Sequence, residues 1–166
     1  MNILGIIPTR GGSKGLQSKN LKVLTGKPLI AWTIEAAKAS EHISLVVVTT
    51  DSVDIAKSAK QHGAEVPFMR PLELAGDLST AYDVVMPTLL WLEENENYST
   101  DLVVLLPPTA PLLAAEDIDR GIETLQKHPK ADSLRPIIES SKHPFTTFTV
   151  EIEYLKPLFR KRSDRF

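Results

Sequence analysis

The sequence of 166 residues contains no cysteine, which excludes disulfides, cysteine-ligated zinc and thiol nucleophiles within it. Its net charge is only −2, so no overall basic field indicates nucleic acid or an anionic membrane as a partner. The apolar run after Met1 is too short for a signal peptide or a membrane span and lacks a basic leader. These absences predict a cytoplasmic protein that binds neither nucleic acid nor membrane.

The first twenty residues hold the pattern on which the functional prediction depends. A continuous apolar run predicts a buried parallel strand over 3–8, and it leads into a loop rich in glycine and cations. The loop contains Gly11, Gly12 and Gly15 together with Arg10, Lys14 and Lys19. Glycine lets backbone N–H groups approach an oxyanion, and the cations balance its charge. Taken alone, the loop fits a phosphate site and a solvated turn equally well.

Strand and helix patterns then alternate along the chain. Helical periodicity predicts helices over 28–40, 52–62, 80–97 and 115–128. Apolar or alternating runs predict strands over 45–50, 64–69, 102–106, 131–138 and 148–154. We expect Asp51 or Ser52 to cap the second helix and Ser79 to cap the third. The order predicts an α/β fold, doubly wound, with a mainly parallel sheet and helices on both faces.

In open α/β sheets, ligands bind beyond the carboxyl ends of the strands. The loops at 8–20, 49–52 and 106–111 follow predicted strands and therefore lie at that edge. We expect the basic loop and the proline-rich loop at 106–111 to face each other across one crevice.

Two common phosphate motifs do not fit the sequence. Gly26-Lys27 has Leu21 where a P-loop needs its first glycine, and Pro28 where it needs a hydroxyl residue. The glycines at 11, 12 and 15 lack the spacing of the dinucleotide fingerprint. A third interpretation is a nucleotidyltransferase loop.

Four blocks of the sequence resemble the acylneuraminate cytidylyltransferases, the CMP-sialic acid synthetase family, in the family's order. They are IIPTRGGSKGLQSKNLKVLTGKPLIAWTIEAAKAS, VVVTTDSVDIAKSAKQHGAEVPFMRPLELAGDLSTAYDV, DLVVLLPPTAPLL and KHPF. The related CMP-Kdo synthetases usually carry an aromatic residue where Gly11 stands, so the sialic acid branch fits better.

The resemblance implies a Rossmann-like nucleotidyltransferase that uses CTP. The anomeric hydroxyl of a nonulosonic (sialic-type) acid would attack the α-phosphorus, forming CMP-sugar and releasing pyrophosphate. Positioning and charge stabilisation suffice for such a transfer, without a covalent nucleophile. Which acid is used stays open among sialic, legionaminic, pseudaminic and Kdo acids. One alternative is a non-catalytic nucleotide-binding or dimerisation module of the same fold, and another is a nucleotidyltransferase for a different base or sugar phosphate.

The resemblance also assigns roles to individual residues. It implies catalytic roles for Arg10 and Lys19. The implied nucleotide-binding residues are Gly11, Gly12, Ser13, Lys14, Asn20, Arg70, Ser79 and Thr80, and the implied sugar-binding residues are Thr109 and Arg162. Three simpler interpretations stay open: Arg70 paired with Glu73, Asp51 as a plain helix cap, and Arg162 within a solvated charge run.

The sequence departs from the family pattern in the segment expected to face the sugar, in the predicted helix 80–97, where Pro87 replaces a histidine, and in its acidic pair. Pro107 and Leu113 replace a glutamine and an arginine in the segment expected to face the sugar, and Pro107 offers no side-chain donor. The family's Asp-x-Asp pair, which holds Mg²⁺, is expected beyond residue 166. Asp117 and Asp119 have that spacing but stand at a predicted helix start, where acids favour the helix dipole. No residue within the chain is therefore assigned to a metal.

We expect one cytidylyltransferase domain over 1–166 that is short at its C-terminal end. The resemblance implies that residues 143–166 form a dimerisation arm, so that the protein is a homodimer and a partner chain covers the apolar side of 148–154.

Overall fold

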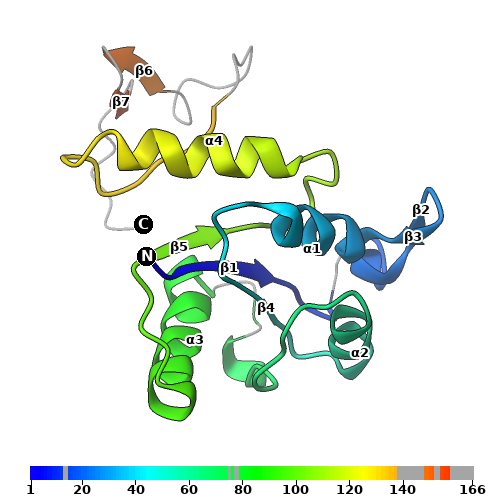
Figure 1. Cartoon of the computed structure of the whole chain (residues 1–166). Coiled ribbons are helices and arrows are strands. Elements are labelled where there is room, and N and C mark those ends of the chain that lie inside the picture. Colours follow the sequence, from blue (N-terminus) through cyan, green and yellow to red (C-terminus); the bar gives the residue numbers. More distant parts are fainter. Residues whose placement is uncertain (13–14, 75, 77–78, 138–147, 152–153, 158–166) are drawn as a thin grey trace. The chain divides into compact units, whose positions relative to one another are not determined.

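The computed structural model describes residues 1–12, 15–74, 76, 79–137, 148–151 and 154–157 (Figure 1). The chain divides into two compact units, Met1–Ala131 and Asp132–Phe166. Among the described residues, no helix is long and apolar enough to cross a membrane.

A parallel three-stranded sheet forms the centre of the first unit, in the order β4-β1-β5 (Figure 1). Its strands are β1 (Ile3–Pro8), β4 (Leu45–Thr49) and β5 (Leu102–Leu105). Ile6 of β1 stands opposite Val47 on one side and Leu105 on the other. The central position of β1 explains its continuous apolar sequence, because both of its faces are covered. The predicted strand over 3–8 and the parallel sheet are confirmed.

Helices cover both faces of the sheet. Successive side chains of a strand point to opposite faces, so the apolar strands present apolar side chains to the helices on each face. On one face, Ile3 and Ile7 pack in a core with residues of α1 (Leu29–Ala39), α2 (Val53–Gln61) and α4 (Ala115–Gln126). On the other face, Leu4 and Ile6 pack against Leu92 of α3 (Ala81–Glu96). This arrangement confirms the doubly wound α/β fold.

Short elements shape the segment between β1 and α1. The 3₁₀ helix η1 (Lys19–Leu21) is followed by a hairpin of β2 (Val23–Leu24) and β3 (Lys27–Pro28). Thr25 and Gly26, with φ of 46° and 95°, form the turn that joins these two strands. A second 3₁₀ helix, η2 (Leu72–Leu74), precedes α3.

Two predicted strands are absent from the described residues. Only isolated parallel bridges occur between 64 and 69, where Glu65 pairs with Val47 and Met69 with Thr50. Pro67 lacks an N–H group and interrupts the ladder between these bridges. The described part of 131–138, residues 131–137, is irregular.

The cap of α3 also differs from the prediction. Thr80 is its N-cap rather than Ser79, because Thr80 and Asp83 form a reciprocal capping box. The Thr80 N–H donates to the Asp83 carboxylate at 2.7 Å, and the Asp83 N–H donates to Thr80 Oγ1 at 3.3 Å. The Thr80 N–H and the Thr80 hydroxyl, which donates at 2.8 Å, both bind the Asp83 carboxylate and hold its pKa below the usual value.

In the second unit, β6 (Phe148–Glu151) and β7 (Tyr154–Pro157) pair in antiparallel fashion, with Glu151 opposite Tyr154. The prediction of one strand over 148–154 is therefore wrong, because Tyr154 pairs back against the first strand. The KHPF segment and Arg162 lie outside the described residues.

Candidate active site

The carboxyl ends of the three parallel strands lie at one edge of the sheet. β1 ends at Pro8, β4 at Thr49 and β5 at Leu105. Beyond the end of β1, the Thr9 N–H donates to the Thr49 carbonyl oxygen at 3.0 Å, so the first two strands stay side by side as their loops begin. This edge carries the loops from which the sequence predicts the site.

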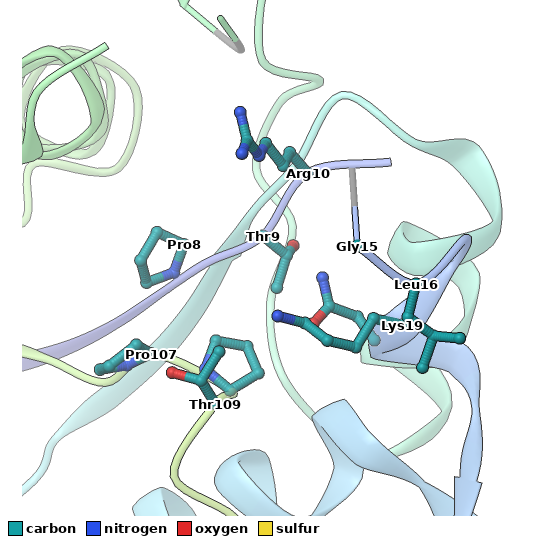
Figure 2. Close-up of a pocket in the computed structure, with 10 residues that line it drawn as sticks. Pro8, Thr9, Arg10, Gly15, Leu16, Lys19, Pro107 and Thr109 are labelled. Carbon is teal, nitrogen blue, oxygen red and sulfur yellow. The ribbon is translucent and has the colours of Figure 1, made fainter. Parts of the chain in front are cut away.

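A pocket of ≈ 440 Å³ opens at this edge (Figure 2). Its lining comes from two segments of the chain: Pro8, Thr9, Arg10, Gly15, Leu16, Lys19 and Asn20 from the first, and Pro107, Pro108 and Thr109 from the second. The predicted crevice between the basic loop and the proline-rich loop is confirmed.

The two walls of the pocket differ in chemistry. In Figure 2, Lys19 stands on one side and Pro107 with Thr109 on the other, while the Arg10 side chain extends away from Lys19. The first segment supplies the positive charge, and the second supplies two proline rings and the Thr109 hydroxyl. Cations such as those of the first wall form charge-assisted hydrogen bonds with phosphate oxygens.

The 3₁₀ helix η1 fixes two of the polar lining residues. The Lys19 N–H donates to the Leu16 carbonyl at 3.2 Å, and the Leu21 N–H donates to the Ser18 carbonyl at 2.9 Å. Asn20 lies between them and is only 6% exposed, although it lines the pocket. Lys19 and Asn20 therefore reach the pocket from a hydrogen-bonded turn.

The start of the basic loop is attached to the junction between β4 and α2. The Gly11 N–H donates to Asp51 Oδ1 at 2.8 Å. Ser52, not Asp51, caps α2, because its hydroxyl accepts the Ile55 N–H at 3.4 Å. The interpretation of Asp51 as a plain helix cap is therefore wrong: its carboxylate binds the loop.

Arg70 is a buried residue between the first two strands, with 7% of its surface exposed. Its guanidinium donates to the carbonyl oxygen of Thr9 at 2.7 Å and also to the carbonyl oxygen of Thr49. Burial lowers the pKa of Arg70, the Asp51 charge opposes this shift, and the Arg10 charge adds to it. These donors serve the strand ends rather than Glu73, so the proposed Arg70–Glu73 pair is wrong.

The other predicted site residues have different positions. Thr109 lines the pocket, and Gly12 is exposed. Ser79 and Thr80 precede α3 and do not line the pocket. Ser13, Lys14 and Arg162 lie outside the described residues. The nucleotide and sugar roles of all these residues stay predictions.

Sequence reasoning missed Asp51 as a loop contact and Thr9 and Thr49 as partners of Arg70. One signal in the sequence could have indicated these contacts: the three residues stand at the ends of β1 and β4 or immediately after them. Sequence position alone does not show which of two neighbouring polar side chains turns toward the adjacent loop.

The described residues include Asp117 and Asp119, the pair with the Asp-x-Asp spacing. No group of three or more histidine, aspartate or glutamate side chains gathers among them. Asp117 accepts the Ala114 N–H at 3.3 Å and pairs with Arg120. Asp119 instead accepts hydrogen bonds from the Ser40 hydroxyl and, at 3.1 Å, the Glu41 N–H. The two carboxylates thus have separate structural partners.

Curated relatives share substantial sequence identity with this chain. It is 44% identical over 123 residues to a CMP-N,N'-diacetyllegionaminic acid synthase of Legionella pneumophila, covering 74% of this chain and 53% of the relative. It is 36% identical over 140 residues to an N-acylneuraminate cytidylyltransferase of Escherichia coli, covering 84% and 32%. It is 37% identical over 123 residues to a pseudaminic acid cytidylyltransferase of Campylobacter jejuni, covering 74% and 53%. The chain therefore spans about half the length of these relatives or less.

Solved structures share the fold. A CMP:2-keto-3-deoxy-manno-octonic acid synthetase in complex with CTP matches with a TM-score of 0.62 and 22% identity, over 78% of this chain and 49% of that chain. A 4-diphosphocytidyl-2C-methyl-D-erythritol synthase matches with a TM-score of 0.59 and 16% identity, over 85% and 65%. The family model described as cytidylyltransferase matches residues 4–162. With this match across nearly its whole length, the chain belongs to the cytidylyltransferase family, as its sequence blocks predicted.

Proposed function

We propose that this protein transfers CMP from CTP to the anomeric hydroxyl of a nonulosonic, sialic-type acid and releases pyrophosphate. The observation that carries the proposal is the pocket at the carboxyl ends of β1 and β5, with Lys19 and Arg10 in its lining. The names of the relatives support the substrate class, since they specify legionaminic, acylneuraminic and pseudaminic acids.

The chemistry requires charge stabilisation more than a nucleophile from the protein. The anomeric oxygen bonds to the α-phosphorus, the bond from that phosphorus to the bridging oxygen breaks, and pyrophosphate leaves with the electron pair. The hydroxyl proton passes to solvent or to a base. Free CTP carries roughly four negative charges, and the Lys19 ammonium and the Arg10 guanidinium offset part of that charge. The pocket walls would hold the two reactants in line.

The opposite wall is the proposed place of the sugar acid. Thr109 provides a hydroxyl there, and the neighbouring Pro107 and Pro108 provide apolar rings. Arg162 is proposed as a partner of the substrate carboxylate, because a guanidinium matches a carboxylate in a bidentate manner.

We further propose a requirement for Mg²⁺, a homodimer and a cytoplasmic location. A requirement for Mg²⁺ rests on the family resemblance. A homodimer built on residues 143–166 also rests on that resemblance. A cytoplasmic location is consistent with the absence of cysteine.

The test is to incubate the protein with CTP, Mg²⁺ and, separately, sialic, legionaminic, pseudaminic and Kdo acids. Formation of pyrophosphate and a CMP-sugar with one of the first three supports the proposal. Calorimetric binding of CTP without turnover of any acid would instead support the non-catalytic nucleotide-binding module, which the enzyme names of the relatives do not favour. Turnover with another nucleotide but not with CTP would contradict the choice of base.

A further inference from the structure

Gly11 is the residue through which the basic loop contacts the next strand–helix junction. Its N–H donates to Asp51 Oδ1 at 2.8 Å. A Cβ atom placed on Gly11 would lie 3.2 Å from Ser52 Cβ, which is tighter than an ordinary van der Waals contact. The backbone of the loop therefore lies directly against residues 51–52, and the hydrogen bond and the close approach fix it at the same point.

The junction that receives Gly11 is itself held in place. The Ser52 N–H donates to Thr50 Oγ1 at 3.2 Å, and the Ser52 hydroxyl accepts from the first turn of α2. Asp51 is half-buried, and its negative charge acts on the buried Arg70 guanidinium.

Thr9, the residue before Arg10, is also held in place by hydrogen bonds. Thr9 is 4% exposed, its N–H donates to the Thr49 carbonyl at 3.0 Å, and its own carbonyl accepts from Arg70 at 2.7 Å. Arg10 thus stands between two anchored neighbours, Thr9 and Gly11. The backbone from which its side chain leaves is determined by contacts with β4 and with the residues that follow β4.

We propose that Asp51 is a positioning residue of the nucleotide site: by accepting the Gly11 N–H, it holds the loop so that Arg10 lines the pocket. The identity of the ligand, CTP, rests on the proposed function. Asp51 acts on the ligand through Arg10 and does not line the pocket itself. The benefit is preorganisation, because a loop held in its binding conformation loses less entropy when the ligand arrives. In this arrangement the Gly11 N–H is an anchor of the loop and is engaged by a carboxylate rather than offered to a phosphate.

The experiment compares Asp51→Ala with Asp51→Asn. Alanine removes the acceptor, whereas asparagine keeps a carbonyl oxygen that can accept the Gly11 N–H. Asp54→Ala is the matched control. Asp54 is an exposed acid, the second residue of α2, and its replacement by alanine changes the net charge by the same amount as Asp51→Ala. Hydrogen exchange of the Gly11 amide is measured without nucleotide, CTP affinity is measured by calorimetry, and thermal unfolding shows that each variant is folded.

We expect the Gly11 amide of Asp51→Ala to exchange about tenfold faster and its Kd for CTP to rise about tenfold, as loss of one charge-assisted hydrogen bond implies. Asp51→Asn and Asp54→Ala should stay within about threefold of the wild type on both measurements. A double-mutant cycle with Arg10→Ala then tests whether Asp51 acts through Arg10. Asp51→Ala should add little to the loss in CTP affinity already caused by Arg10→Ala.

Unchanged Gly11 exchange in Asp51→Ala would overturn the anchor. Equal losses in Asp51→Asn and Asp51→Ala would overturn the hydrogen bond as its basis, and full additivity with Arg10→Ala would overturn the action through Arg10. If the wild type bound no CTP, the proposed function would fail separately, and the exchange measurement would still decide whether Asp51 anchors Gly11.

Discussion

The Arg70 guanidinium donates a hydrogen bond of 2.7 Å to the main-chain carbonyl of Thr9, at the point where β1 becomes the basic loop. The same nitrogen donates to the Thr49 carbonyl, so one buried cation joins the ends of two neighbouring strands. A carbonyl that is buried without its donor costs about 1–3 kcal/mol. Arg70 therefore shapes the edge of the sheet at which the pocket opens.

Replacing Arg70 by alanine should lower the free energy of unfolding by about 2–4 kcal/mol, because the buried Thr9 carbonyl loses its Arg70 donor and a cavity is created. The Thr49 carbonyl still accepts the Thr9 N–H and adds less to the loss. Arg70→Lys should recover only part of this loss, since an ammonium cannot reproduce the planar fork. Urea denaturation of the two variants and the wild type measures the effect. A loss below about 0.5 kcal/mol for Arg70→Ala, the range of an ordinary surface change, would contradict the structural role.

Gly11→Ala should destabilise the protein by about 1 kcal/mol, because the new methyl group must displace Ser52 by a few tenths of an ångström or shift the loop. Gly12→Ala is the matched control. A Cβ atom on Gly12 would meet nothing within 4 Å. Thermal unfolding of both variants gives the comparison, and an equal melting temperature for the two would show that the close approach to Ser52 has no energetic consequence.

Asp119 should make folding stability depend on pH in the acid range. Burial raises the pKa of Asp119, but hydrogen bonds from Ser40 and the Glu41 N–H, together with the charge of His42, outweigh it and hold the pKa below its usual value. A carboxyl group with a depressed folded pKa contributes stability above its unfolded pKa and loses that contribution as pH falls through the folded value.

The wild type should therefore be more stable than Asp119→Asn at pH 5 to 7, and the difference should shrink as the pH falls through 3.8, where the carboxyl of the unfolded chain is half protonated. Urea denaturation at a series of pH values measures this. A difference that stays constant from pH 6 to pH 3 would show that ionisation of Asp119 does not stabilise the fold.

The layers of the fold could be predicted from the sequence because burial leaves a strong pattern. The apolar run at 3–8 is covered on both faces, and it was predicted with its observed bounds. The weaker predictions failed where local chemistry decides between neighbours. Ser79 and Thr80 are both good caps, and Thr80 is used because Asp83 stands three residues later and completes the capping box.

For the candidate site, too, the position could be predicted from the sequence, whereas the contacts of individual side chains could not. The order of strands and loops was enough to bring residues 8–20 and 107–109 to one pocket. The contact between Asp51 and Gly11 could not be predicted, because it depends on which side chain at the end of β4 faces the adjacent loop. The segment at 131–137 has apolar residues but no strand, and Leu134 and Ile137 remain 42% and 48% exposed, so burial does not enforce an extended conformation there.

The role of the pocket in CMP transfer is tested by the rate of CMP-sugar formation from CTP by the wild type, Lys19→Ala and Lys22→Ala, with the sugar acid that the wild type uses best. Lys19 lines the pocket, whereas Lys22 is exposed and does not line it, so the two variants lose the same charge at different places. We predict that Lys19→Ala lowers kcat/KM by about 10- to 1000-fold, as expected when a cation that stabilises the transition state is removed. Lys22→Ala should stay within about threefold of the wild type, in the range of a surface change. Equal rates for Lys19→Ala and the wild type, or no product from the wild type with any sialic-type acid, would contradict the account.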